Sequence, residues 1–167
     1  PTVCNDSRNY VSGTVDGHEA RDTGTTQSGD GCTGGCQWEQ ACSADGTIAC
    51  GGSESGSLIL TWNDAFYYAC GTSDASGEDE IYSFTATSSG VASATVSGNG
   101  GLLGNNINLY VMEGACNPQL CVSAGESTSD DTAYFTVTAG RTYYLAAELD
   151  GVGFPPNFSY TLSLTCP

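Results

Sequence analysis

The acidic side chains of this sequence are grouped in a way that could bind a cation. Glu78, Asp79 and Glu80 are consecutive, and Asp130 and Asp131 form a second group within a Ser-rich stretch. Adjacent carboxylates repel one another, the chain has no Lys to neutralise them, and a hard cation with oxygen ligands relieves that repulsion. We therefore expect these five residues to bind one or more Ca²⁺ ions. A solvated acidic surface and a catalytic carboxylate pair remain the alternatives.

Groups that could carry out covalent or acid–base catalysis are scarce. The only histidine, His18, follows Asp16-Gly17, which reads as a turn. The string closest to a nucleophile elbow, residues 52–56 (GSESG), has Glu where the nucleophilic Ser should stand. A general base also needs a placed partner, so a surface turn is the better interpretation of His18. The sequence therefore predicts a protein that is not an enzyme.

Cysteines are the second group of reactive side chains, at positions Cys4, Cys32, Cys36, Cys42, Cys50, Cys70, Cys116, Cys121 and Cys166. The four between residues 32 and 50 could surround zinc, but in an oxidising compartment the same thiols become disulfides. We expect at least three intramolecular disulfides, including one between Cys116 and Cys121 across a turn at Pro118. Because the total is odd, one Cys stays free or bonds to another chain.

The same cysteine content indicates a secreted protein at the cell surface or beyond it. The chain begins with Pro1 and no apolar segment follows, so we expect that a leader has been removed. Two triplets of the glycosylation type, Asn5-Asp6-Ser7 and Asn157-Phe158-Ser159, fit exposure outside the cell.

Charge excludes two classes of partner. The 19 acidic and 3 basic residues give a formal net charge of -16, with an isoelectric point near 4.1. Nucleic-acid binding requires cationic side chains that displace phosphate counterions, so a nucleic-acid partner is excluded. Docking on anionic membranes is disfavoured for the same reason. No apolar run reaches the roughly 18 residues that would span a bilayer, so we expect no membrane span.

The elements that must position these side chains change character along the chain. Residues 1–57 are rich in Gly, Ser, Thr and Asp, hold five of the cysteines and show little apolar alternation. Such a segment cannot fill a core by itself, so disulfides must fix much of it. We therefore expect one domain over residues 1–167, in which a loop-rich, disulfide-rich elaboration (1–57) precedes the core (58–167).

From residue 80 onward, apolar residues recur at every second position, as in half-buried strands. Tyr82, Phe84 and Ala86 share one face of the first such segment. The same pattern recurs in segments 92–97, 107–112, 133–137, 143–149 and 158–164, which are separated by Gly-rich or Asn-rich turns. Short strands with one polar face predict an all-β, antiparallel sandwich or barrel with little helix.

Residues 80–166 resemble the bacterial pre-peptidase C-terminal domain, a jelly-roll-like β-sandwich related to collagenase collagen-binding domains. The matching segments are 80–85 (EIYSFT), 107–111 (INLYV), 134–145 (YFTVTAGRTYYL) and 158–164 (FSYTLSL). The Ala-Gly-x-Thr-Tyr-Tyr string at 139–144 is the most specific of these. The resemblance implies a jelly-roll-like β-sandwich that is non-catalytic and often appended to secreted hydrolases, with calcium sites in some members.

One departure from the family bears on calcium. Where the family has an acidic Asp-x-Asp-Leu-Tyr run, this chain has Asn106-Ile107-Asn108-Leu109-Tyr110. Amide oxygens can still ligate calcium, but the loss of two charges weakens any site at that run.

Two non-enzymatic functions remain. The first is an extracellular structural or adhesive subunit that self-associates into an oligomer or filament and is stabilised by calcium; residues 1–15, with Tyr10 and Val11, would contact a neighbouring copy. The alternative is an accessory module of a secreted hydrolase that binds a polysaccharide or a protein polymer. Aromatic side chains that could stack on sugars or grip a partner are Trp38, Trp62, Tyr67, Tyr68, Tyr143, Tyr144 and Phe154.

Overall fold

The computed structural model describes residues 42–58, 61, 63–65, 67–73, 75, 77–98, 106–150 and 159–167. The chain divides into two compact units, residues 1–41 and 42–167, and the described residues belong to the second. They form strands and loops, apart from one 3₁₀ turn at Pro118–Leu120. Within the described ranges, no helix is long and apolar enough to cross a membrane.

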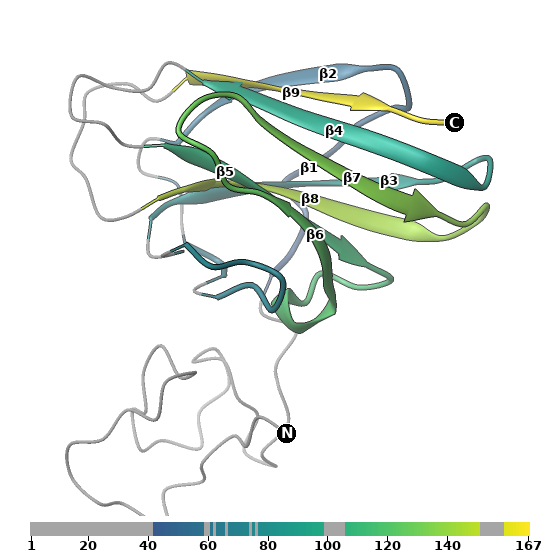
Figure 1. Ribbon diagram of the computed structural model, residues 1–167, viewed down its shortest axis with the longest axis horizontal. Helices are drawn as coiled ribbons and strands as arrows, with labels where there is room; N and C mark the ends of the chain where they lie inside the picture. The colour runs from purple at the N-terminus through teal and green to yellow at the C-terminus, as the bar shows by residue number, and fades with distance from the viewer. Residues whose placement is uncertain are drawn as a thin grey trace, which may run out of the picture. The chain divides into compact units, whose positions relative to one another are not determined.

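Two sheets face each other as the layers of a sandwich (Figure 1). The five-stranded sheet has the order β1-β3-β8-β5-β6, with bounds Gly46–Thr47, Asp79–Thr85, Thr142–Leu149, Ile107–Glu113 and Cys121–Gly125. The four-stranded sheet has the order β2-β9-β4-β7, with bounds Ser53–Ser57, Ser159–Thr165, Gly90–Gly98 and Asp131–Val137. All pairs are antiparallel except β1 with β3. The all-β antiparallel sandwich predicted from the sequence is confirmed.

The sandwich begins earlier than predicted. Strands β1 and β2 lie before residue 58, where the sequence pattern placed the start of the core, and both belong to the sheets. Strand β2 reads Ser-Glu-Ser-Gly-Ser and has no apolar residue to mark it. Its five residues are paired in full with β9, so the backbone ladder holds the strand in place of an apolar face.

The main core lies between the two sheets and follows the predicted alternation. In β4, Ala92, Ala94 and Val96 are buried, and in β9 Leu162 and Leu164 are buried. The facing positions come from β8 and β5: Leu145, Ala147 and Leu149, with Ile107, Leu109 and Val111. Every second residue of each strand therefore packs inward, as expected when a sheet has one face on the core.

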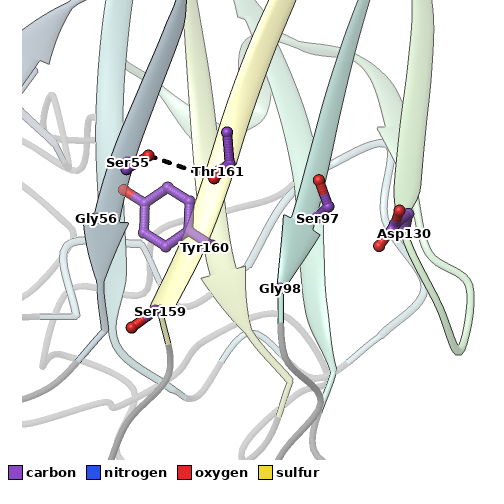
Figure 2. A pocket seen from close by; sticks show the side chains of 8 residues that line it. All are labelled: Ser55, Gly56, Ser97, Gly98, Asp130, Ser159, Tyr160 and Thr161. Atoms are coloured by element: carbon purple, nitrogen blue, oxygen red, sulfur yellow. Dashed lines mark hydrogen bonds between the residues drawn. The ribbon is translucent and has the colours of Figure 1, made fainter.

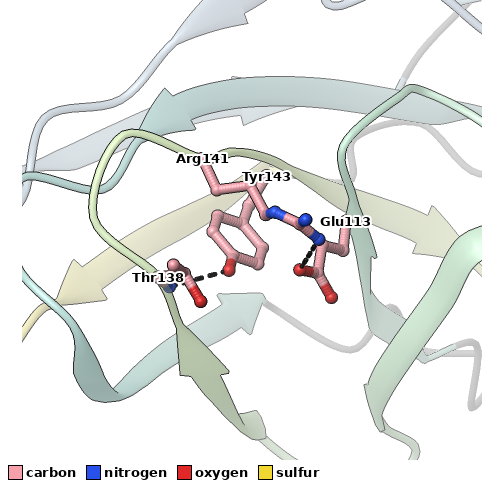
Figure 3. Close-up of polar contacts among 4 residues, drawn as sticks. All are labelled: Glu113, Thr138, Arg141 and Tyr143. Atoms are coloured by element: carbon pink, nitrogen blue, oxygen red, sulfur yellow. Dashed lines mark hydrogen bonds and ion pairs between the residues drawn. The ribbon is translucent and has the colours of Figure 1, made fainter.

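Three aromatic rings close one end of this core. Phe84, Phe135 and Tyr143 come from β3, β7 and β8, and their centroids are 5.4 to 6.2 Å apart. The Tyr143 hydroxyl accepts a hydrogen bond from the Thr138 backbone N–H at 3.0 Å (Figure 3). Nearby, at the surface, Arg141 Nη1 donates to Glu113 Oε1 at 2.6 Å. An exposed ion pair of this kind is worth at most about 1 kcal/mol.

Tyr143→Phe is expected to lower the free energy of unfolding by about 1–2 kcal/mol. The substitution keeps the ring and removes the acceptor, which leaves the Thr138 N–H without that partner. Urea unfolding measures the loss. Tyr134→Phe is the matched control, because Tyr134 is 70% exposed and its change should stay within about 0.5 kcal/mol. Equal effects of the two substitutions would contradict this role of the Tyr143 hydroxyl.

Three disulfides join the described residues: Cys42–Cys116, Cys50–Cys166 and Cys70–Cys121. The predicted number of at least three is reached, but the predicted Cys116–Cys121 bridge is wrong. Each of these two residues pairs instead with a Cys from the segments that precede β3. The turn between them is closed locally by Asn117, whose side chain accepts from the Gln119 N–H at 2.9 Å. Cys4, Cys32 and Cys36 lie outside the described residues.

A second apolar cluster covers the outer face of the five-stranded sheet. Residues that precede β3 (Cys42, Ala65, Tyr68 and Ala75) pack there against Ile81, Tyr110, Met112, Cys116 and Ala146. The Tyr68 and Tyr110 rings are stacked, with centroids 3.9 Å apart. This face is thus covered by the chain itself, whereas no apolar cluster of the described residues covers the outer face of the four-stranded sheet.

Candidate binding surface on the four-stranded sheet

The outer face of the four-stranded sheet is formed by the mostly polar residues that alternate with the buried residues along each strand. Its positions are Ser53, Ser55 and Ser57 in β2; Ser159, Thr161, Ser163 and Thr165 in β9; Val91, Ser93, Thr95 and Ser97 in β4; and Thr132, Tyr134 and Thr136 in β7. We call this set the hydroxyl face. Twelve of these side chains are Ser or Thr, and none of the set is charged.

Strand register arranges the hydroxyl face in rows that cross the sheet. One row runs Ser53–Ser163–Thr95–Thr132, and another runs Ser55–Thr161–Ser97. Neighbouring members of a row are separated by the strand spacing of about 4.8 Å. Thr95 and Thr132 share a hydrogen bond of 2.9 Å between their hydroxyls, and Ser55 and Thr161 share one of 3.3 Å. Each hydroxyl can both donate and accept, so the rows keep further hydrogen-bonding capacity toward solvent.

A groove of about 490 Å³ lies at one end of the hydroxyl face (Figure 2). It is lined by Ser55, Gly56, Ser97, Gly98, Asp130, Ser159, Tyr160 and Thr161. Val96 pairs with Asp131, which places the preceding residue, Asp130, opposite Ser97. Asp130 therefore extends the Ser55–Thr161–Ser97 row and brings a carboxylate to the rim of a groove otherwise lined by neutral residues.

The other end of the face carries its exposed apolar side chains. Val91 is 64% exposed and Tyr134 is 70% exposed. Because Ser93 pairs with Tyr134 and Val91 with Thr136, Val91 and Tyr134 are diagonal neighbours on adjacent strands. Sequence reasoning missed Tyr134 as a candidate. The available signal was the polar half of the alternation, in which Tyr134 stands among Ser and Thr with no charged residue.

None of the described sequence candidates for stacking (Tyr67, Tyr68, Tyr143 and Tyr144) belongs to this face. Tyr68 and Tyr143 are fully buried, and Tyr144 packs against the second apolar cluster. Trp38, Trp62 and Phe154 lie outside the described residues, as does His18. The structure therefore does not place the one candidate base, and a non-catalytic function stays a prediction.

Glu80 and Asp79, two of the carboxylates expected to bind calcium, point to opposite faces of β3. Glu80 faces between the sheets, where its carboxylate accepts a hydrogen bond from the Tyr160 hydroxyl. The hydroxyl oxygens of Tyr160 and Tyr82 also lie within hydrogen-bond distance, 3.1 Å apart. Gly56 makes room for this arrangement, because a Cβ at that position would collide with Tyr160 and Glu80. Burial and the bond to Glu80 raise the pKa of Tyr160, so this phenol stays protonated.

Asp79 lies on the outer face of β3, beneath the residues that precede the strand. It is 3% exposed, and its Oδ2 atom accepts hydrogen bonds from the backbone N–H groups of Asp64 and Ala65 at 3.1 and 3.0 Å. Across the sheet it pairs with Glu148, which is also buried. Burial and the neighbouring Asp64 carboxylate raise the pKa of Asp79 to about 8, more than the two N–H donors lower it.

Asp131 and Asp130 are separated in the same way. Asp131 is buried, and its carboxylate accepts from the Ser127 N–H at 2.5 Å and from Asn106 Nδ2 at 3.4 Å. Asp130 is exposed at the groove. Asn106 also donates to Asn108 Oδ1 at 2.9 Å, so both amides of the Asn106–Tyr110 run take part in side-chain hydrogen bonds.

The structure thus does not bring the five predicted calcium ligands together. No group of three or more His, Cys, Asp or Glu side chains with metal-binding geometry occurs in the described part of the chain. Alternation along β3 explains the separation, since successive side chains leave opposite faces of a sheet. Calcium binding stays a prediction, without a preformed set of ligands at these positions.

Comparison with known proteins finds similar solved structures, but their sequence identity to this chain is low. No family model matches the chain, and no curated protein matches it. The pre-peptidase C-terminal domain of collagenase from Bacillus anthracis matches with 14% identity and a TM-score of 0.49, over 74% of this chain and 98% of that one. A Podospora anserina GH26-CBM35 β-(1,4)-mannanase matches with 11% identity and a TM-score of 0.33, over 70% of this chain and 28% of that one. The first of these carries the domain that residues 80–166 resemble.

Proposed function

We propose that this chain is a non-catalytic, extracellular adhesive module whose hydroxyl face binds a hydroxyl-rich polymer that carries no negative charge. The observation that supports the proposal is the composition of that face. In a chain with a net charge of -16, the fourteen positions of one complete sheet face contain no carboxylate. A partner that approaches this face therefore meets no carboxylate on it that would repel a like charge at close range.

Rows of hydroxyls suit a polysaccharide for a chemical reason. Sugar hydroxyls and Ser or Thr hydroxyls each donate and accept, so every contact can exchange a bond to water for a bond between partners. Tyr134 and Val91 supply the apolar surface on which a sugar ring can stack. The row that contains Tyr134 and Ser93 lies about 14 Å along β4 from the groove row that contains Ser97, which suits an extended ligand.

The scaffold is suited to binding outside the cell. Three disulfides and a paired ladder across all four strands hold the hydroxyl face in one shape, so binding orders few side chains. Disulfides of this number accord with an oxidising, extracellular location. The resemblance of residues 80–166 to domains appended to secreted hydrolases accords with an accessory role, in which the bound polymer would be the hydrolase's substrate.

Thr95→Glu is expected to lower the affinity for the polymer by at least tenfold. The substitution places a carboxylate in the central row of the hydroxyl face, where a bound chain would desolvate it. Co-sedimentation with insoluble neutral polysaccharides, such as cellulose, mannan and chitin, measures binding; alginate serves as the acidic polymer that should not bind.

Thr85→Glu is the matched control for this experiment. Thr85 lies in β3 of the other sheet, and its hydroxyl shares a bond of 3.1 Å with Thr142, much as Thr95 does with Thr132. The control changes the net charge equally but leaves the hydroxyl face intact. Equal binding by both variants, or no binding of any neutral polymer by the unmodified protein, would contradict the proposed function.

Self-association is a second candidate function, favoured by the exposed apolar pair on the same face. Two copies of a chain with a net charge of -16 repel each other, and Val91 and Tyr134 lie where no charged side chain intervenes. Strand β7 is also an edge strand of its sheet, in which the Tyr134 carbonyl already accepts a hydrogen bond from the Ser123 hydroxyl and other backbone groups are left to pair with another strand. The predicted contact of residues 1–15, with Tyr10 and Val11, lies outside the described residues. Light scattering at high protein concentration and raised salt tests this candidate, and a monomer under those conditions contradicts it.

A further inference from the structure

We propose that the groove at Asp130 is a subsite for the ammonium group of an amino sugar, so that the polymer bound by the hydroxyl face contains sugars with free amines. This inference rests on the proposed function and names the class of polymer. It is carried by the position of one carboxylate at the end of a row of hydroxyls, within a groove of about 490 Å³.

The side chains around the groove match the hydrogen-bonding needs of an ammonium group. Ser55, Thr161 and Ser97 form the row that Asp130 extends, and Ser159 lies on the next position of the same strand face as Thr161. Figure 2 shows the Ser97 and Asp130 side chains on neighbouring strands at one side of the groove. An ammonium group has three N–H donors and no acceptor, so one carboxylate and two hydroxyl oxygens can accept all three of its hydrogen bonds.

Charge over the rest of the molecule favours the same ligand. The net charge of -16 creates a field that attracts a polycation and repels an acidic glycan before contact is made. Arg141, the one basic side chain among the described residues, donates to Glu113 and does not line the groove. A cationic sugar therefore meets an acidic residue at the groove with no competing cation from the lining.

A neutral sugar would use the groove less well. A hydroxyl group can donate one hydrogen bond to Asp130, whereas an ammonium group donates a hydrogen bond and also carries the opposite charge, which adds Coulomb attraction to the carboxylate. Acetylation of the amine removes the positive charge while the sugar ring and its hydroxyls stay the same. The pair of free and acetylated amino sugars therefore reports the contribution of the amine's charge, and the Asp130→Asn variant tests whether the groove provides it.

Binding of glucosamine oligomers and N-acetylglucosamine oligomers of equal length, measured by calorimetry at a pH where the free amines are protonated, tests the inference. The unmodified protein should bind the free-amine oligomer about tenfold more tightly than the acetylated one. Asp130→Asn should remove that preference and leave the affinity for the acetylated oligomer unchanged. Glu113→Gln changes the net charge equally but lies on β5 of the other sheet, so it should keep the preference.

The outcomes separate the inference from the proposed function. Equal binding of both oligomers by the unmodified protein overturns the amino-sugar subsite, while the proposed function stands. The same holds if Asp130→Asn and Glu113→Gln reduce the preference alike, because that result assigns it to net charge alone. If neither oligomer nor any neutral polysaccharide binds, the proposed function itself fails. Because Asp130 is exposed, the fold of Asp130→Asn, checked by circular dichroism, should match that of the unmodified protein.

Discussion

Asp79→Asn is expected to stabilise the protein by about 4–5 kcal/mol at pH 9. Asp79 is buried beneath the residues that precede β3, near Asp64 and Asp45 and opposite Glu148, and its pKa is raised from 3.8 to about 8. A difference of one pH unit in pKa corresponds to about 1.4 kcal/mol, so ionising this carboxylate in the folded protein costs about 6 kcal/mol. Asn keeps an oxygen that can accept from Asp64 and Ala65, although burying its NH₂ group returns about 1–2 kcal/mol of that gain.

The sign of the pH dependence follows from proton uptake. Between pH 4 and pH 8 the folded protein holds a proton on Asp79 that the unfolded chain has released. Stability from this group is therefore complete below about pH 4 and is lost by about 1.4 kcal/mol per unit as the pH rises to 8.

Glu126 has the opposite effect on the pH dependence of stability. Burial alone would raise its pKa, but hydrogen bonds from Thr72, Ser73 and Tyr110 lower it, so its contribution is lost as the pH falls.

Urea unfolding of the two proteins from pH 4 to pH 9 isolates Asp79, because every other group is common to both. Near pH 4 the Asn variant should be about 1–2 kcal/mol less stable than the unmodified protein. The two curves should cross near pH 5, and above that the variant should be increasingly the more stable up to pH 8. Parallel curves would show that Asp79 is ionised in the folded protein, and the raised pKa would then be wrong. Repeating the series with EDTA and with Ca²⁺ tests the calcium prediction, since an ion bound to Asp79 would hold its carboxylate ionised and flatten the curve of the unmodified protein.

The two faces of β3 show why the strands could be predicted from the sequence and the carboxylate partners could not. Alternation of Tyr82 and Phe84 with polar residues marks the strand, because one face meets the main core. Asp79 and Ile81 on the other face are buried as well, under residues that join β3 only through the fold. A sequence with both faces covered does not reveal which side each carboxylate takes. Adjacent acids therefore looked like one cluster.

The hydroxyl face and the disulfides were also only partly predictable, because the residues are visible in the sequence but their partners depend on the fold. Ser and Thr at alternate positions predict a polar strand face, but the rows and the groove depend on register, which pairs Thr161 with Ser55 and with Ser97. Disulfide partners depend on which loops fold over a sheet. Cys116 and Cys121 are close in sequence, yet each lies next to a Cys from a segment that packs on the outer face of the five-stranded sheet.

Removal of the Cys50–Cys166 disulfide, by Cys50→Ala with Cys166→Ala, is expected to lower the free energy of unfolding by about 4 kcal/mol. The bridge joins residues 116 positions apart, and cross-linking a loop of roughly that length restricts the unfolded chain by about 4–5 kcal/mol. The backbone bonds from Gly51 N–H to Leu164 and from Leu164 N–H to Gly52 remain, so the native structure near the bridge should persist.

We expect the loss of this disulfide to destabilise strand β2 most, because β2 has no apolar side chain to hold it. It forms one edge of the hydroxyl face, is paired with β9 alone among the described strands, and begins three residues after Cys50. In the variant, hydrogen exchange at β2 amides should become faster relative to β8, which is paired on both sides within the five-stranded sheet. If stability falls by less than about 1 kcal/mol, or if exchange rises equally in both strands, the bridge does not secure that edge. Loosening of β2 would also displace Ser55 at one end of the groove. If the proposed function is correct, polymer binding should therefore weaken in the same variant, even at temperatures where the sandwich stays folded.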